Sequence, residues 1–178
     1  MMDSIKIHDL YFRPYLSAAD IRKRVEAMGH ELNAVYADKK PVFLGVLNGA
    51  FVFAADLLRA CPFECELSFI KLSSYSGTAS TGDVVTRIGL EADLAGRHVV
   101  LVEDIIDSGL TMHRFLPELQ ALKPASVAIA ALLVKPEAME YQIRVDFRGF
   151  DIPQKFVVGY GLDYDGLGRN LEDIYEVS

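Results

Sequence analysis

The chain of 178 residues is poor in cysteine, lacks tryptophan and carries fewer basic than acidic side chains. Its two cysteines, Cys61 and Cys65, are too few for a disulfide framework or a four-cysteine zinc site, and C-x₃-C is not the redox C-x-x-C pattern. We expect both to be buried structural thiols. The net charge of −7 argues against nucleic-acid partners, whose phosphates need a basic surface, and against a membrane surface. It allows a small polyanion that arrives with a divalent cation.

Long apolar runs are also missing. No run is long enough to span a bilayer, and the opening Met-Met-Asp-Ser-Ile-Lys has no apolar signal core, so a cytoplasmic location is expected. The sequence is 51% hydrophobic and 24% charged, without a low-complexity tract, internal repeat or linker. These features predict one globular domain over residues 1–178.

Apolar patterning predicts alternating strands and helices. After a capping box at Ser17, apolar residues at helical spacing predict one long helix to about Lys39. Pro117 is expected to kink a later helix. Continuous apolar runs predict strands at 42–47, 66–72, 99–102 and 126–134, helices at 50–60 and 109–122, and short extended segments at 145–147 and 155–160. This order predicts an α/β fold, a Rossmann-like parallel sheet with helices on both faces.

The most informative stretch is Val-Val-Leu-Val-Glu-Asp-Ile-Ile-Asp-Ser-Gly-Leu-Thr at 99–111. Its predicted strand ends in adjacent carboxylates, Glu103 and Asp104, at the edge where open α/β sheets bind ligands. A phosphate cradle follows, with an N-cap carboxylate, a glycine for close approach, two hydroxyls and the free N–H groups of a starting helix. These features come from Asp107, Ser108, Gly109, Leu110 and Thr111. A phosphorylated sugar suits both halves, because its diol donates to the carboxylates while its phosphate occupies the loop.

This stretch resembles the phosphoribosyl pyrophosphate (PRPP) motif of the type I phosphoribosyltransferases. The resemblance implies their fold, including a small hood that carries the base-binding segment, and a requirement for Mg²⁺. It implies PRPP contacts from Glu103, Asp104 and residues 107–111, and metal contacts from Glu103, Asp104 and Asp163. It also implies that Asp107 is the catalytic base at purine N7.

A second anion site is expected where Leu47-Asn48-Gly49 follows a strand and opens a helix. Alone, Asn-Gly is an ordinary turn. The resemblance makes these three residues a pyrophosphate loop, and Arg169 matches the family arginine that faces pyrophosphate. Asn48 stands where 6-oxopurine members usually carry lysine, so only backbone contacts carry over. Leu110 also replaces a common lysine, without loss of a backbone donor.

Residues 155–163, Lys-Phe-Val-Val-Gly-Tyr-Gly-Leu-Asp, resemble the signature of the hypoxanthine-guanine branch of this family. The resemblance implies that Phe156 stacks on the purine, that Lys135 donates to its O6, and that the backbones of Val157 and Asp163 read the ring edge. Taken alone, Phe156 would be interpreted as a core aromatic and Lys135 as a solvated lysine at a strand end.

Residues 73–83 are rich in serine, threonine and glycine and have almost no apolar anchor, which predicts a mobile surface loop. Ser74 and Tyr75 within it resemble the family's catalytic lid. Such a lid closes over a ligand and excludes water.

The resemblance runs from Leu47 to Arg169 in the family's order. It implies transfer of the 5-phosphoribosyl group from PRPP to hypoxanthine and guanine, forming IMP or GMP and pyrophosphate in purine salvage, by a homodimer or homotetramer. Two alternatives stay open. A xanthine-preferring phosphoribosyltransferase would keep the PRPP loop, and a non-enzymatic RNA-binding regulator could use the same fold. Against the regulator stand the charge of −7 and the lack of basic clusters beyond residues 22–24.

Overall fold

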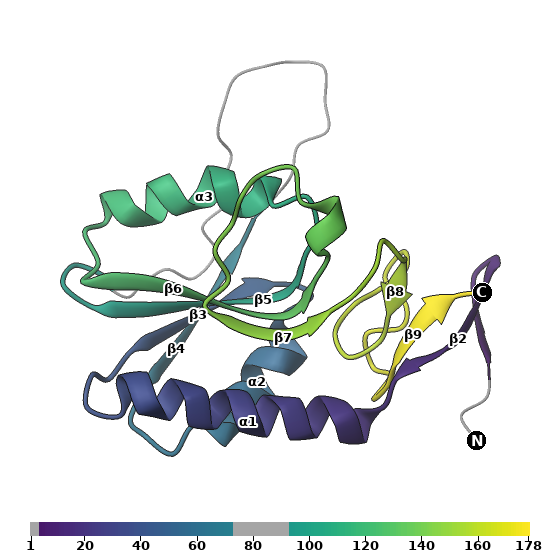
Figure 1. Ribbon diagram of the computed structural model, residues 1–178, viewed down its shortest axis with the longest axis horizontal. Coiled ribbons are helices and arrows are strands. Elements are labelled where there is room, and N and C mark those ends of the chain that lie inside the picture. Colours follow the sequence, from purple (N-terminus) through teal and green to yellow (C-terminus); the bar gives the residue numbers. More distant parts are fainter. Residues whose placement is uncertain (1–3, 73–92) are drawn as a thin grey trace.

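A five-stranded sheet forms the centre of the molecule (Figure 1). The computed structural model describes residues 4–72 and 93–178. The strand order is β4-β3-β5-β6-β7, and every neighbouring pair is parallel. The strands are β3 (Val42–Leu47), β4 (Glu66–Lys71), β5 (His98–Ile106), β6 (Ser126–Val134) and β7 (Phe147–Asp151). The parallel sheet predicted from the buried apolar runs is therefore confirmed.

Helices cover both faces of this sheet, as predicted. The helices α1 (Ala18–Tyr36) and α2 (Phe51–Ala60) lie on one face, and α3 (Leu110–Ala121) lies on the other (Figure 1). Ser17 caps α1, because its Oγ accepts the N–H of Asp20. The buried stripe of α1 then packs toward the sheet through Ile21, Val25, Met28, Leu32 and Tyr36.

Several elements differ from their predicted limits. Strand β5 does not end before the carboxylates; it continues to Ile106, because Glu103 and Ile105 keep their ladder positions opposite β6. Helix α3 runs through Pro117 to Ala121 as one element. The extended segment expected at 145–147 becomes β7, which begins at Phe147, and the segment expected at 155–160 contains only the short strand β8 (Val157–Val158).

A second sheet forms the hood expected from the resemblance. It contains β1 (Ile5–Ile7), β2 (Leu10–Leu16), β9 (Ile174–Val177) and β8, in the antiparallel order β1-β2-β9-β8. It has a small core of its own, made by Ile7, Phe12, Val158 and Tyr175. The sequence did not predict the N-terminal hairpin β1–β2 or the C-terminal strand β9. These strands bring the two ends of the described chain to the segment that is expected to bind the base.

Strand β7 lies at one edge of the large sheet, and α1 covers part of that edge. The Arg24 guanidinium donates to the carbonyl oxygens of Arg148 and Gly149 at 2.5–3.2 Å. Its third nitrogen donates to Glu31 at 2.7 Å, which fixes the side chain along the helix. One residue of α1 thus occupies backbone acceptors of the edge strand.

The two cysteines lie at the C-terminal end of α2 and in the loop before β4. Both are free and partly buried. Burial raises the pKa of Cys61 to about 12, and burial also raises the pKa of Cys65. Both thiols therefore stay protonated at neutral pH, which agrees with the predicted structural role.

Two further expectations concern membrane-spanning segments and the loop at 73–83. In the segments 4–72 and 93–178, no helix is long and apolar enough to cross a membrane. The expected loop at 73–83, with Ser74 and Tyr75, lies outside the described residues.

A buried carboxylate ties the hood together. Glu176 is only 4% exposed; its Oε1 accepts a hydrogen bond from Arg13 Nε at 2.7 Å, and Lys155 pairs with its Oε2. The hydrogen bond from Lys155, helped by that from Arg13, lowers the pKa of Glu176 in spite of its burial. Three segments of the hood, β2, the residue before Phe156 and β9, meet at this carboxylate.

We expect Glu176→Gln to lower the free energy of unfolding by roughly 1.5–3 kcal/mol at pH 7, the range for hydrogen bonds to charged groups. The folded-state pKa lies below the unfolded value of about 4.3, so this stabilisation is complete above that value and is lost as the pH falls through the folded pKa. Urea unfolding of both proteins between pH 7 and pH 3 measures the difference. The exposed Glu172→Gln serves as the control. A difference that stays constant across this range would contradict the role of Glu176.

Candidate functional site

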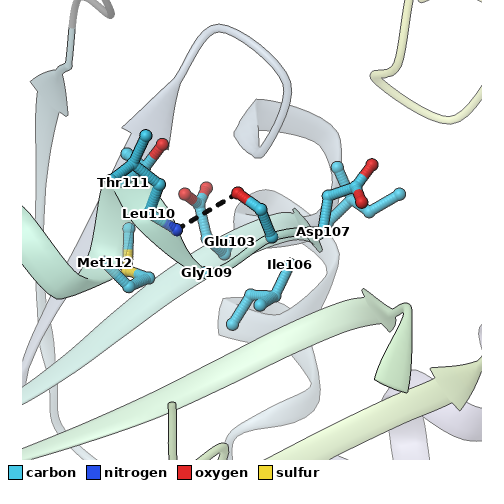
Figure 2. A pocket seen from close by; sticks show the side chains of 9 residues that line it. Glu103, Ile106, Asp107, Gly109, Leu110, Thr111 and Met112 are labelled. Atoms are coloured by element: carbon cyan, nitrogen blue, oxygen red, sulfur yellow. Dashed lines mark hydrogen bonds between the residues drawn. The ribbon is translucent and has the colours of Figure 1, made fainter. Parts of the chain in front are cut away.

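A hollow of about 100 Å³ opens where β5 passes into α3 (Figure 2). It is lined by Glu103 and by the residues from Ile105 to Met112. Gly109 occupies the N-cap of α3 with φ 81°, and the Leu110 N–H donates to Ser108 Oγ at 3.3 Å. Because the first N–H groups of a helix have no intrahelical acceptor, this hollow offers donors to an anion. A hollow therefore lies where the sequence predicts a phosphate cradle.

The predicted N-cap role of Asp107 is wrong. The N-cap is Gly109, which has no side chain to cap the helix, and the acceptor for the Leu110 N–H is Ser108 Oγ, not Asp107. The Asp107 carboxylate instead pairs with Lys135 Nζ at 2.7 Å. A charged partner supplied by the end of β6 outcompetes the local helix cap.

The loop is braced by the segment that follows β6. The Ser108 carbonyl accepts the N–H groups of Glu140 and Tyr141, each at 3.0 Å. A Cβ on Gly109 would lie 2.7 Å from the Tyr141 carbonyl oxygen, so only glycine fits here. Sequence analysis missed Tyr141, whose ring also lies 4.6 Å from that of His113 in α3. No spacing signal connects residue 141 with the loop at 107–111.

The two carboxylates of β5 serve different sides of the strand. Glu103 is buried and faces the hollow, whereas Asp104 lies against Gly49. This follows from strand geometry, since successive side chains point to opposite faces. Burial raises the pKa of Glu103 well above its ordinary value, and the neighbouring Asp104 charge raises it further. Burial also raises the pKa of Asp104 to about 6.

The loop 47–49 touches both Asp104 and the hood. It follows β3, with a cis peptide between Leu47 and Asn48 and with Asn48 exposed. A Cβ on Gly49 would lie 1.6 Å from Asp104 Oδ2, and a Cβ on Gly161 would lie 2.2 Å from the Gly49 carbonyl oxygen. Three segments far apart in sequence therefore meet at two glycines. Sequence analysis missed Gly161, for which the Gly-Tyr-Gly pattern at 159–161 was the available signal.

Arg169 closes this side of the site. Its Nη1 donates to the Gly161 carbonyl at 2.7 Å, and its Nη2 pairs with Asp163 Oδ1 at 2.6 Å. The Arg169 charge also lowers the pKa of Asp104, against the larger effect of burial, while the Asp163 charge raises it. The structure therefore gathers Arg169, Asp163 and Asp104 around the loop 47–49.

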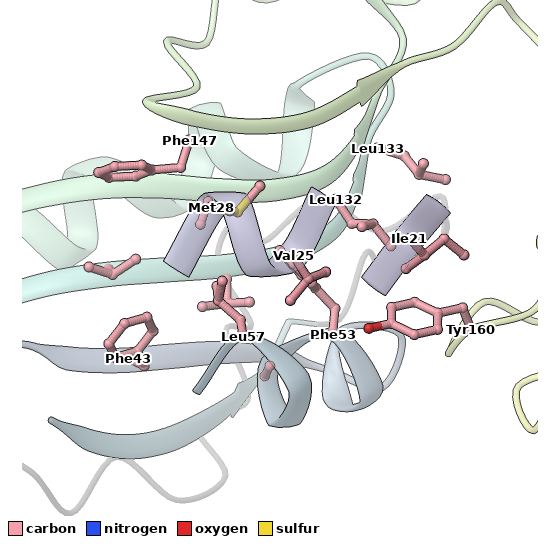
Figure 3. Close-up of a cluster of buried hydrophobic side chains, with 14 of the residues drawn as sticks. Ile21, Val25, Met28, Phe43, Phe53, Leu57, Leu132, Leu133, Phe147 and Tyr160 are labelled. Atoms are coloured by element: carbon pink, nitrogen blue, oxygen red, sulfur yellow. The ribbon is translucent and has the colours of Figure 1, made fainter. Parts of the chain in front are cut away.

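Tyr160 anchors this part of the hood to the core. Its side chain is buried among apolar residues of α1 and α2, and Figure 3 shows its hydroxyl pointing toward Phe53. The hydroxyl donates to Asp56 Oδ2 at 2.7 Å, and Asp56 also pairs with Arg59 at 3.1 Å. The segment that holds Gly161 and Asp163 is thus fixed to the helix that follows the loop 47–49.

The remaining expected base-binding residues lie in two places. Lys135 follows β6; its side chain is 12% exposed and its backbone N–H donates to the Ile106 carbonyl, so it is not a solvated strand-end lysine. Phe156 lies in the hood and is 43% exposed, so it is not a core aromatic. Its neighbour Val157 is buried in β8, opposite Glu176.

The carboxylates fit a hard divalent cation without enclosing one. Within the two described segments, no three His, Cys, Asp or Glu side chains come together as a metal site. Mg²⁺ is usually held by one or two carboxylates together with water and substrate oxygens, so a complete protein cage is not required. Burial raises the pKa of the Glu103 and Asp104 carboxyl groups, and a nearby cation would stabilise their ionised forms.

The glycine contacts predict an order of stability among alanine variants. Gly161→Ala should cost most, because its obstacle is backbone and its φ is +101°. Gly49→Ala displaces a side chain and should cost about 1–3 kcal/mol, whereas the exposed control Asn48→Ala should cost less. Urea unfolding measures each value. In an Asp104→Ala background the cost of Gly49→Ala should fall while that of Gly161→Ala stays, and equal costs in both backgrounds would refute the contact.

Comparisons with known proteins agree with this geometry. A family model described as a phosphoribosyl transferase domain matches residues 15–165. The hypoxanthine-guanine-xanthine phosphoribosyltransferase of Tritrichomonas foetus is 41% identical over 172 residues, which cover 96% of this chain and 91% of that protein. The hypoxanthine-guanine phosphoribosyltransferase of Bacillus subtilis (strain 168) is 41% identical over 165 residues, which cover 92% of this chain and 91% of that protein.

A solved structure is also similar. The hypoxanthine-guanine phosphoribosyltransferase of Bacillus anthracis superposes with a TM-score of 0.86 at 32% identity, covering 93% of this chain and 96% of that one. The chain belongs to the phosphoribosyltransferase family.

Proposed function

We propose that this protein transfers the 5-phosphoribosyl group of PRPP to hypoxanthine and guanine in purine salvage, forming IMP or GMP and pyrophosphate. One observation carries the proposal: Lys135 Nζ lies 2.7 Å from Asp107 Oδ2, and Asp107 lines the hollow at the start of α3. Purine N7 and O6 are neighbours on one edge of the ring, so an adjacent base and cationic donor match a 6-oxopurine. The relatives at 41% identity that are named hypoxanthine-guanine phosphoribosyltransferases support the same substrates.

The 5′-phosphate of PRPP would occupy the hollow at the start of α3. The N–H groups of Gly109, Leu110 and Thr111 and the hydroxyls of Ser108 and Thr111 would be its donors, and the Leu110 N–H would exchange its bond to Ser108 Oγ for one to the phosphate. A partial positive charge at the helix N-terminus adds to these contacts, so the absence of a lysine at Leu110 leaves the site attractive to an anion.

The pyrophosphate would lie between the backbone of Leu47, Asn48 and Gly49 and the guanidinium of Arg169. A guanidinium carries five N–H donors in a fixed fork, which suits two phosphate groups. The contacts of Arg169 with Gly161 and Asp163 hold its guanidinium in position beside the loop 47–49. The leaving group would thus be held by fixed dipoles and one cation.

Glu103 and Asp104 would hold the ribose-diol side of PRPP, and with Asp163 they are the candidate contacts of Mg²⁺. When bound, Mg²⁺ supplies positive charge that offsets the charge of the leaving pyrophosphate. We expect turnover to disappear in excess EDTA and to return on addition of Mg²⁺. Full turnover in excess EDTA would exclude this role of the carboxylates.

The purine would stack on Phe156, with its edge read by Lys135 and by the backbones of Val157 and Asp163. An exposed aromatic ring in a site is available for such stacking. Asp107 accepts the N7 proton as the base attacks C1′, so the developing charge on the purine is removed within the site.

The domain organisation, the cellular location and the oligomeric state belong to the proposal as well. We take residues 1–178 as one phosphoribosyltransferase domain, since Tyr160–Asp56 and Gly161–Gly49 join the hood to the core. The free, partly buried thiols favour a reducing compartment, hence the cytoplasm. A homodimer or homotetramer belongs to the proposal too; in a solved relative, the hypoxanthine phosphoribosyl transferase of Trypanosoma cruzi, the C-terminal region has a role in the oligomeric state. Light scattering after gel filtration measures the state of this chain.

The two other functions receive less support. The Tritrichomonas foetus relative is named for xanthine together with hypoxanthine and guanine, so xanthine belongs in the substrate panel. The net charge of −7 argues against an RNA-binding regulator, because phosphate contacts need a basic surface. A gel-shift titration against RNA at several salt concentrations tests it directly.

We expect Asp107→Asn to lower kcat by roughly 10²–10⁴-fold, the typical contribution of a positioned general base, while KM for PRPP changes little. Steady-state kinetics with hypoxanthine measures both constants. The exposed Asp38→Asn is the matched control and should behave as the unmodified protein. A near-normal kcat for Asp107→Asn would rule out this assignment.

A nucleobase panel with PRPP and Mg²⁺, followed by pyrophosphate release, tests the function itself. Hypoxanthine and guanine should be used, and adenine should be rejected by as much as ~10⁴, because Lys135 can only donate and would meet the adenine amino group. Lys135→Ala should impair both 6-oxopurines and narrow the gap to adenine. Comparable kcat/KM values for adenine and hypoxanthine in the unmodified protein would overturn the proposal.

A further inference from the structure

The N-terminal hairpin β1–β2 reaches the aromatic ring assigned to purine stacking. Phe12 of β2 is fully buried, and its ring centroid lies 6.1 Å from that of Phe156, at an interplanar angle of 47°. Tyr164 lies edge-on to Phe156 at 5.6 Å and 82°, and it is 6.3 Å from Phe12. The three rings form one cluster, and Phe156 is its exposed member.

Tyr164 is itself held by the turn of the hairpin. Its hydroxyl donates to Asp9 Oδ1 at 2.7 Å, and its ring lies edge-on to His8 at 5.4 Å. Backbone hydrogen bonds in both directions with Leu167, at 2.9 and 3.1 Å, close the loop that carries it. The hydrogen bond lowers the pKa of Asp9 and raises that of Tyr164, so donor and acceptor keep the required protonation states at neutral pH.

A stacking ring is useful only when its plane is fixed before the ligand arrives. Phe156 is 43% exposed and would otherwise rotate, and ordering a side chain on binding costs affinity. An edge-to-face neighbour restricts that rotation without covering the ring. Tyr164 meets this requirement, because Asp9 holds its far end.

We propose that Tyr164, anchored by Asp9, is a positioning residue for Phe156, so that the turn of the N-terminal hairpin forms part of the purine site. The inference rests on the proposed function, in which Phe156 stacks on the base. The inference assigns a role to the hairpin, which takes no part in the proposed contacts with the phosphates of PRPP.

The test compares KM for hypoxanthine with KM for PRPP. Tyr164→Leu should raise KM for hypoxanthine about 2- to 10-fold, the value of one aromatic pair, and leave KM for PRPP unchanged. Asp9→Ala and Tyr164→Phe keep the ring but remove the hydrogen bond, so they should raise KM for hypoxanthine by a smaller factor. Asp9→Asn still offers an oxygen acceptor, so its KM for hypoxanthine should be that of the unmodified protein. Tyr11→Phe removes an exposed hydroxyl from the same hairpin and is the matched control.

A double-mutant cycle separates positioning from general stability. In a Phe156→Ala background Tyr164→Leu should add nothing to KM for hypoxanthine, because no ring remains to be oriented. An undiminished effect in that background, or an equal rise in both KM values, would overturn the inference. If Tyr164→Leu does not fold, Asp9→Ala and Tyr164→Phe provide the same comparison.

Binding of IMP, measured by calorimetry, separates a failure of the proposed function from a failure of this inference. An unmodified protein that neither binds IMP nor uses hypoxanthine would remove the proposed function and this inference together. An unmodified protein that uses hypoxanthine, with variants whose KM for hypoxanthine is unchanged, would remove this inference alone.

Discussion

Two neighbouring carboxylates inside a buried strand are the constraint on which the rest of the site depends. Burial raises the pKa of both Glu103 and Asp104, which means that their ionised forms lack full compensation in the free protein. The surroundings are built around that need. Gly49 leaves room for one carboxylate, Arg169 supplies a nearby positive charge, and the hollow leaves an approach to the other. In the proposed function, a ligand that brings a divalent cation would supply the positive charge that the protein alone does not.

The parallel sheet explains why separate motifs meet at this point. The carboxyl ends of parallel strands lie along one edge, and the sheet order sets β3, β5 and β6 next to one another. The loop 47–49, the loop 107–111 and Lys135 follow these three strands in turn. The hood then adds Phe156 and Arg169 from a segment that no large-sheet strand carries. In the proposed function, the phosphates and the base would therefore each take contacts from both the large sheet and the hood.

Sequence reasoning succeeded where a feature is encoded locally. Strands β3 and β6 have the predicted limits, because continuous apolar runs bounded by Pro41 and Lys135 leave little choice. It failed where distant segments decide. Asp107 has the chemistry of an N-cap, yet Lys135 takes its carboxylate. The hairpin and β9 were missed because short strands with Pro14, Arg13 and Glu176 carry weak apolar signals, and their pairing spans nearly the whole chain. The family resemblance supplied the hood, but it could not show that Asp9 reaches Tyr164.

The contact of Arg24 with β7 has a consequence for the solution behaviour of the protein. An outer strand presents backbone groups that can template addition of a strand from another molecule. Arg24 engages two carbonyls of that strand and places a guanidinium, fixed by Glu31, across the path of an incoming chain. Helix α1 thus hinders the edge-to-edge association of two sheets at β7.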